Sequence, residues 1–124
     1  MRRALFFLAS ISLPAAAQAQ DMRLDTFLEK ADRLEKRGPL ALFSDDLDIL
    51  KSEVEASARQ YRARIAADRE AGRSPHSCPP ERGGAKLGSD ELLRHFRSYP
   101  ASRRTSLTVR QGFFDLMASR FPCG

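Results

Sequence analysis

The two cysteines of this 124-residue chain, Cys78 and Cys123, constrain its fold more than any other feature. In an oxidising compartment a cysteine pair normally forms a disulfide. A Cys78–Cys123 bond closes a loop of roughly 45 residues, for which loop-closure entropy gives about 4 kcal/mol of stabilisation. Typical domains are stable by only about 5–15 kcal/mol. A metal site is the alternative, but the two thiols lack the paired spacing of zinc sites, so we predict a structural disulfide.

The N-terminus predicts export to such an oxidising compartment. Arg2 and Arg3 precede an apolar run over residues 4–13, and small residues follow up to Ala19. This order is typical of a Sec-type signal peptide, whereas a membrane span needs about 20 apolar residues. We therefore expect residues 1–19 to be removed by cleavage near Ala19, leaving a periplasmic or secreted protein without a transmembrane segment. The alternative is an N-terminal anchor that stays uncut.

Charge is distributed unevenly along the mature chain. Residues 21–56 carry 10 acidic and 6 basic residues, a net charge of −4, whereas residues 57–124 carry 6 and 13, a net charge of +7. A basic surface attracts anionic partners. For an exported protein we expect no nucleic-acid partner, which leaves cell-wall polymer, lipid head groups or an acidic protein. The alternative is that the charges only solvate helix faces.

Apolar residues recur at helical spacing in four segments of the chain. They predict helices over residues 24–36, 45–71, 89–99 and 102–120. The apolar residues of the last helix lie on more than one face, which is typical of a central helix, and no segment shows the alternation of a strand. The expected fold is all-α, a small bundle of about four helices with one disulfide, in a single domain over residues 20–124.

Glycine, proline and serine mark where the first two helices begin and end. Gly38 and Pro39 end the first helix, and an apolar linker follows over residues 40–43. Ser44 is a good N-cap for the second helix, and Gly72 is expected as its C-terminal cap. At roughly 27 residues the second helix is about 40 Å long, so its far end is expected to project or to pair with a second chain in a homodimer.

No recognisable catalytic or metal-binding constellation is present in the sequence. His76 lies two residues before Cys78, but the disulfide uses that sulfur and no orienting side chain is evident. His95 is expected at the surface or its boundary. The acidic first turn of helix 45–71 lacks the glycine and the distal glutamate of a calcium loop, and the helix N-terminus explains it. We therefore predict a non-enzymatic protein without a cofactor or a metal.

Four arginines are candidate partner contacts. Arg103 and Arg104 open the predicted helix 102–120, where positive charge opposes the helix dipole. They are expected to contact either a partner or the C-terminal carbonyls of a neighbouring helix. Arg62 and Arg69 belong to the basic part of helix 45–71. A wider basic face, suited to anionic envelope components, comprises Arg59, Arg62, Arg64, Arg69 and Arg73.

The second half of the chain carries an ordered series of short motifs. These are Cys-Pro-Pro at 78–80, Gly-Ser-Asp-Glu-Leu-Leu at 88–93, Tyr-Pro-Ala-Ser-Arg at 99–103 and Phe-Pro-Cys at 121–123. In this order they resemble the second half of the Rap/Tai-type immunity proteins, which are small exported helical proteins. Members of that family carry further cysteines in their first half, and this chain has none there. No toxin-contacting residue lies within the matching motifs.

The resemblance implies an exported, non-catalytic binding protein with a protein partner in the periplasm. Proteins of the Rap/Tai type occlude peptidoglycan amidase toxins that are delivered by type VI secretion, so a toxin of that kind is the implied partner. The alternative is a general periplasmic envelope protein that binds anionic cell-wall or envelope components through the basic half of the chain.

Overall fold

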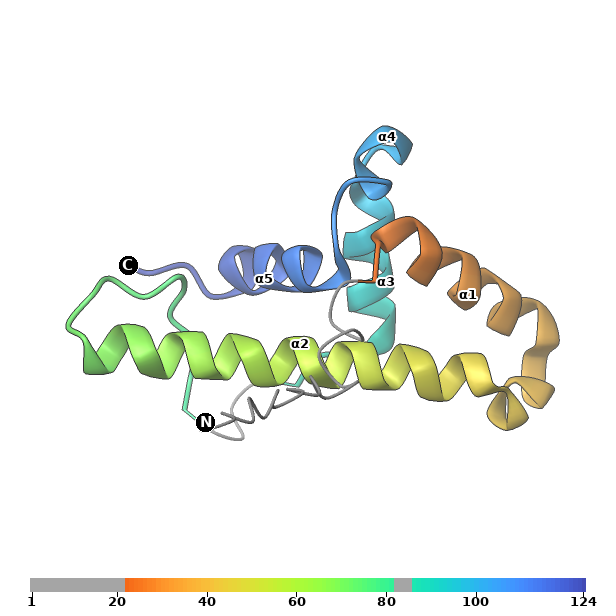
Figure 1. Ribbon diagram of the computed structural model, residues 1–124, viewed down its shortest axis with the longest axis horizontal. Coiled ribbons are helices and arrows are strands. Elements are labelled where there is room, and N and C mark those ends of the chain that lie inside the picture. Colours follow the sequence, from red (N-terminus) through yellow and green to blue (C-terminus); the bar gives the residue numbers. More distant parts are fainter. Residues whose placement is uncertain (1–21, 82–85) are drawn as a thin grey trace, which may run out of the picture.

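The computed structural model describes residues 22–81 and 86–124. The predicted signal peptide and its cleavage near Ala19 lie outside the described residues. The described chain is a small all-α bundle with one disulfide, as predicted. Its elements are α1 (Leu24–Arg37), the 3-10 helix η2 (Gly38–Phe43), α2 (Asp45–Glu70), α3 (Ser89–Ser98), α4 (Ala101–Arg104) and α5 (Val109–Arg120) (Figure 1). No helix in the described ranges is long and apolar enough to cross a membrane.

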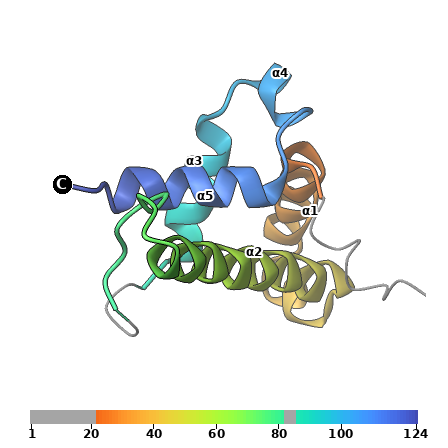
Figure 2. The ribbon, with the colours of Figure 1, turned by 60° about the vertical axis from the view of Figure 1, so that its left-hand side comes forward.

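The longest helix, α2, supports the rest of the bundle. α1 packs against its first half, and α5 runs along its second half in roughly the same direction (Figures 1 and 2). α3 packs against both α1 and α5. The loop after α2 returns beside the end of α5, where the Cys78–Cys123 disulfide joins the two segments. The predicted pairing of the two cysteines is therefore confirmed.

Local capping sets the ends of the first two helices close to the predicted residues. Gly38 ends α1 with a φ of +56°, and its N–H donates to the carbonyl of Glu35. The Ser44 side chain accepts a hydrogen bond from the Asp46 N–H at 3.3 Å, which confirms Ser44 as the N-cap of α2. At the other end, Gly72 has a φ of +67°, in the left-handed region that glycine tolerates.

The predicted single helix over residues 102–120 is wrong, because α4 and α5 are separate helices. Thr108 begins α5 with a capping box: its hydroxyl accepts from the Gln111 N–H at 3.1 Å, and its own N–H donates to the Gln111 side chain at 2.9 Å. The Leu107 carbonyl accepts from the Leu24 N–H at 2.9 Å. A continuous helix would need the Thr108 N–H and the Leu107 carbonyl for its own hydrogen bonds. Here the N–H is used by the cap of α5 and the carbonyl by the start of α1.

The core forms where α1, α3 and α5 meet. Leu24, Phe96 and Val109 are each fully buried, and the rings of Phe27 and Phe96 meet edge to face with their centroids 5.3 Å apart. Gly112 allows α5 to approach α3, since a β-carbon there would lie 3.0 Å from the Phe96 ring. α5 packs against α1, α2 and α3, as expected of a central helix. Its buried residues recur at three- and four-residue spacing, however, so they lie on one face of the helix and not on several as the sequence predicted.

Candidate binding groove

An open groove of about 1050 Å³ lies between α2, α5 and the loop that follows α2. Its floor is mainly apolar. The apolar lining comes from α2, from α5 with the residue after it, and from the loop, namely Val54, Ala58, Ala63, Ile65, Ala66, Phe113, Met117, Phe121, Pro79, Pro80 and Leu87. Sites that bind ligands or peptide segments are commonly concave and largely apolar, with a few polar groups that fix orientation.

Charged side chains of predominantly positive sign line this groove. Arg62 and Arg69 of α2 lie seven residues apart, so they project from the same face of the helix. Within the described part of the chain, neither of them forms an ion pair. The other charged residues of the lining, among those that the structure describes, are Arg120 of α5 and the acid Glu81. The structure thus brings together two of the four arginines that sequence reasoning selected, and adds a third that it missed.

Arg120 is held in place at the end of α5. Its Nη2 donates to the carbonyl of Lys86 at 2.7 Å, and its Nη1 lies 3.6 Å from the Glu91 carboxylate. Its guanidinium also stacks on the Phe121 ring, 5.2 Å from the centroid. Arg120 therefore ties the end of α5 to the segment that enters α3, and its charge in the groove is partly neutralised.

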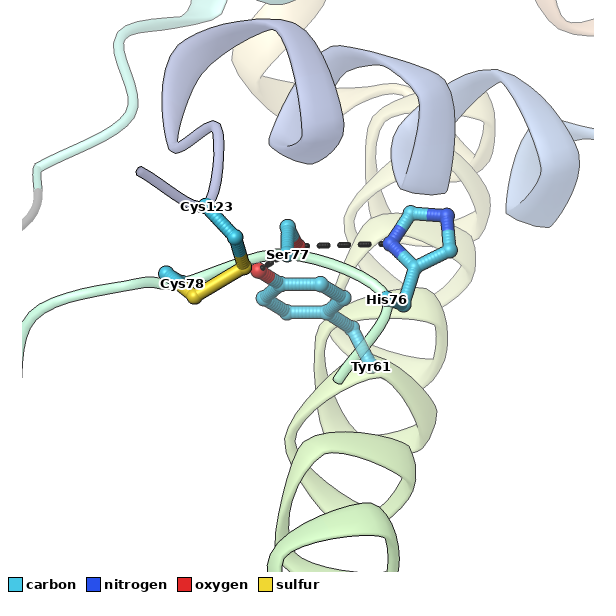
Figure 3. The surroundings of a disulfide bond; sticks show 5 residues. All are labelled: Tyr61, His76, Ser77, Cys78 and Cys123. Carbon is cyan, nitrogen blue, oxygen red and sulfur yellow. Dashed lines mark hydrogen bonds between the residues drawn. A yellow bond between two sulfur atoms is a disulfide. The ribbon is translucent and has the colours of Figure 1, made fainter. Parts of the chain in front are cut away.

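The disulfide lies at one end of the groove, beside a buried hydroxyl pair (Figure 3). The Cys78 N–H donates to the Phe121 carbonyl at 2.8 Å. Next to it, the Ser77 hydroxyl lies 2.5 Å from the Tyr61 hydroxyl and is 3.3 Å from Nδ1 of His76. The contact between Ser77 and Tyr61 fixes the loop against α2. Because Ser77 is only 1% exposed, its hydroxyl is not an accessible nucleophile.

Arg103 and Arg104 lie at α4, away from α2 in both ribbon views (Figures 1 and 2). Arg104 donates to the carbonyls of Arg97 at 2.6 Å, in the last turn of α3, and of Tyr99 at 2.9 Å, directly after α3. This is the carbonyl contact that the sequence offered as the alternative to a partner contact. The Arg103 guanidinium lies over the Tyr99 ring at 5.9 Å. Both arginines thus have intramolecular contacts that the structure describes.

A second polar cluster joins α3 to α5, and sequence reasoning missed it. The Tyr99 hydroxyl donates to the Asp115 carboxylate at 2.7 Å, so Nε2 of His95, at 3.0 Å, must carry a proton and donate to the Tyr99 oxygen. Burial and the hydrogen bond to Asp115 raise the pKa of Tyr99. A phenol with a raised pKa stays protonated at neutral pH. The four-residue spacing of His95 and Tyr99 was the only sequence signal.

Two arginines of the basic face proposed for envelope components form ion pairs within the chain. Arg64 and Arg73 each approach the Asp68 carboxylate at 3.1 Å, and Asp68 is 2% exposed. Burial alone would raise the pKa of Asp68, but hydrogen bonds and charge from Arg73 and Arg64 outweigh it, so the pKa lies below its usual value. Of the five arginines in that face, Arg59, Arg62 and Arg69 keep their charge available.

The acidic first turn of α2 is explained by helix capping and pairing. The Asp46 carboxylate accepts from Lys30 at 2.9 Å and from Arg33 at 3.3 Å, and the hydrogen bond from Lys30 contributes most to lowering the pKa of Asp46. Among the described residues, no cluster of three histidine, cysteine or acidic side chains could hold a metal ion.

A scan of protein-family models and searches of curated proteins and of solved structures found no match to this chain. The resemblance of residues 78–123 to the Rap/Tai-type immunity proteins therefore rests on its sequence motifs alone. Functional inference starts from the groove, the charges along it and the disulfide at its end.

Proposed function

We propose that this chain is an exported, non-catalytic binding protein that holds a segment of a protein partner in the groove between α2 and α5. The observation that carries the proposal is an open groove of about 1050 Å³ that combines an apolar floor with Arg62, Arg69 and Arg120. Aromatic and arginine side chains are the residues most often found at the energetic centre of protein interfaces.

The lining of the groove defines the chemistry of the segment that it would hold. Large apolar side chains of the partner would fill the space above Phe113 and Met117, where burial removes apolar surface from water. Carboxylates of the partner would pair with Arg62 and Arg69. An acidic, amphipathic segment meets both requirements, and the positive charge of the groove would also accelerate its association.

The motifs at residues 78–123 support a partner of the kind bound by the Rap/Tai-type proteins. The Cys-Pro-Pro and Phe-Pro-Cys motifs form one end of the groove, because Pro79, Pro80 and Phe121 all line it. We infer that binding works by occlusion, with the chain covering part of its partner. A secreted peptidoglycan amidase toxin is the proposed partner class.

The test is capture of a stoichiometric partner from periplasmic extract by the folded, oxidised chain, followed by an affinity measurement on the purified pair. Arg62→Glu is expected to weaken the affinity at least tenfold, because it places a negative charge against an acidic segment. Arg59→Glu is the matched control, since it makes the same charge change on α2 outside the groove lining. Equal affinities for both variants would refute the proposed site.

The alternative function is binding of an anionic envelope polymer, which the exposed arginines of α2 favour. Within the described chain, Arg59, Arg62 and Arg69 form no ion pair and remain available to an extended polyanion. Binding of that kind depends on charge alone and weakens steeply with salt. Co-sedimentation with cell-wall fragments at low and high salt tests it. Here Arg59→Glu and Arg62→Glu should weaken binding equally, which separates this function from groove binding.

A further inference from the structure

An apolar tip projects from the bundle at the corner between α1 and α2. It consists of Leu40, Leu42 and Phe43 of η2, which are 68%, 75% and 86% exposed. Figure 1 shows η2 at the opposite end of the molecule from the C-terminus. Together these side chains expose an area on the order of 400 Å², and patches of that size on a single chain are often functional.

Carboxylates flank the tip. Asp45 and Asp48 lie in the first turn of α2, directly after η2, and both are exposed. Neither forms an ion pair with a residue that the structure describes, whereas Asp46 is engaged by Lys30 and Arg33. The tip therefore presents large apolar side chains beside free negative charge.

The tip and the groove are both apolar, and the acidic side of the tip has the opposite charge to the arginines of the groove. Asp45 and Asp48 flank the tip on the α2 side, whereas Lys36 and Arg37 flank it at the end of α1. The groove is concave and apolar, and it is lined by Arg62 and Arg69, which also lack ion pairs within the described chain. The two surfaces lie at different ends of the same long helix, so the contact between them must come from two copies of the chain.

We propose that the tip of one copy occupies the groove of a second copy. α2 carries the tip at its N-terminus and the groove along its second half, so two α2 helices placed antiparallel about a two-fold axis make this contact twice. Two identical contacts close the assembly as a dimer, whereas a single head-to-tail contact would leave an open chain.

The area available favours this arrangement over a contact between two tips. Each tip–groove contact buries on the order of 400 Å² on each side, so the two contacts together bury on the order of 1,600 Å², the standard size of a stable interface. Two tips facing each other would bury only about half of that area, below the size of most stable interfaces.

The inference rests on the groove of the proposed function and deepens it. The tip shows which chemistry the groove accepts, namely large apolar side chains beside carboxylates. A partner segment of that chemistry would compete with the tip of the second copy. The dimer then keeps both apolar surfaces covered until the partner is present, and binding of the partner separates the two copies.

Sedimentation of the mature, oxidised chain over a range of concentrations tests the proposal. The wild-type chain is expected to form a dimer. Phe43→Ser in the tip and the double variant Arg62→Glu with Arg69→Glu in the groove should each weaken dimerisation at least tenfold. Arg94→Glu is the control, because it reverses an exposed charge on α3 outside both the tip and the groove lining and should leave the dimer intact. Circular dichroism checks that every variant stays helical.

Mixing the two defective variants gives the decisive result. Phe43→Ser keeps an intact groove and the arginine double variant keeps an intact tip, so the mixture regains one of the two tip–groove contacts. It should associate more tightly than either variant alone, but more weakly than the wild-type chain. A monomeric wild-type chain at every concentration overturns the proposal. A dimer lost in Phe43→Ser but kept in the arginine variant also overturns it, in favour of contact between tips.

Two further readouts separate this inference from its alternatives. Monomeric wild-type chain that sediments with anionic lipid vesicles through Phe43 would assign the tip to a membrane surface and overturn the dimer. Partner capture by the Phe43→Ser variant tests the proposed function alone, because that variant keeps the groove. If the variant captures the partner and the wild-type chain is monomeric, the proposed function is supported and only the dimer is refuted.

Discussion

Replacing Gly112 by alanine is expected to destabilise the protein, although the same change stabilises most helices. Gly112 lies within α5 and is buried against α3 and α1. A β-carbon at this position would lie 3.0 Å from Cε1 and 3.3 Å from Cδ1 of Phe96, and 3.3 Å from Cδ1 of Leu24. Contacts that short require one of the neighbours to move.

The sign of the effect follows from two opposing magnitudes. Alanine in a helix interior is favoured over glycine by about 0.5–1 kcal/mol. Overpacking a well-packed core costs about 1–3 kcal/mol, and Phe96 and Leu24 are both 0% exposed, so neither can turn into solvent. We expect a net loss of about 1–2 kcal/mol in the free energy of unfolding. For a domain of this size each kcal/mol lowers the melting temperature by about 4–8 °C.

Urea unfolding followed by circular dichroism measures this loss. A double-mutant cycle with Phe96→Leu isolates the contact, since the smaller side chain leaves room for the new methyl group. In that background Gly112→Ala should keep only its helix-propensity gain of about 0.5–1 kcal/mol, which gives a coupling energy of about 1.5–3 kcal/mol. Ala63→Gly on the exposed side of α2 calibrates the helix-propensity term. Stabilisation by Gly112→Ala in the wild-type background would refute the packing argument.

Two further predictions concern the loop and its attachment to α2. The double variant Cys78→Ser with Cys123→Ser should lose about 4 kcal/mol of stability for a loop of 45 residues. A loss under about 1 kcal/mol in urea unfolding contradicts the entropic account. The intact mass of the oxidised wild-type chain should also be two hydrogens lower than that of the reduced chain. Asp68→Asn should destabilise the protein at neutral pH. The folded-state pKa of Asp68 lies below 3.8, so the stabilisation is present above that value and is lost as the pH falls through the lower, folded-state pKa. The difference between wild type and variant should therefore shrink in acid, and a difference that stays constant to pH 2 would count against the carboxylate.

Helix-capping residues made the ends of the helices in the first half of the chain predictable. Gly38 and Ser44 act on the backbone next to them, so their residue types alone indicate where α1 ends and α2 begins. The break before α5 was missed although Thr108 and Gln111 have the spacing of a capping box. The apolar residues between 107 and 121 recur at helical spacing, so the sequence was interpreted as one continuous helix. The hydrogen bond from Leu24 to the Leu107 carbonyl spans most of the chain, and no local pattern predicts such a contact.

Of the candidate site, only its basic residues could be predicted from the sequence. Arg62 and Arg69 stood out because the second half of the chain is basic, and their seven-residue spacing places them on one helix face. The groove beneath them needs Phe113 and Met117 from α5 and Pro79 from the loop, which lie far away in sequence. Helical periodicity indicates which face of a helix is apolar, but it does not indicate whether a neighbouring element covers that face.

The disulfide and the open groove are physically connected. At the end of α5, the covalent bond and the hydrogen bond from the Cys78 N–H to the Phe121 carbonyl hold the loop beside the helix. Holding the end of α5 beside the loop by side-chain packing alone would require more apolar contact there, at the expense of the open groove. A crosslink stabilises the fold through the unfolded chain and buries no apolar surface. A domain of about 100 residues can therefore remain stable while Pro79, Pro80 and Phe121 stay open as the end wall of a binding groove.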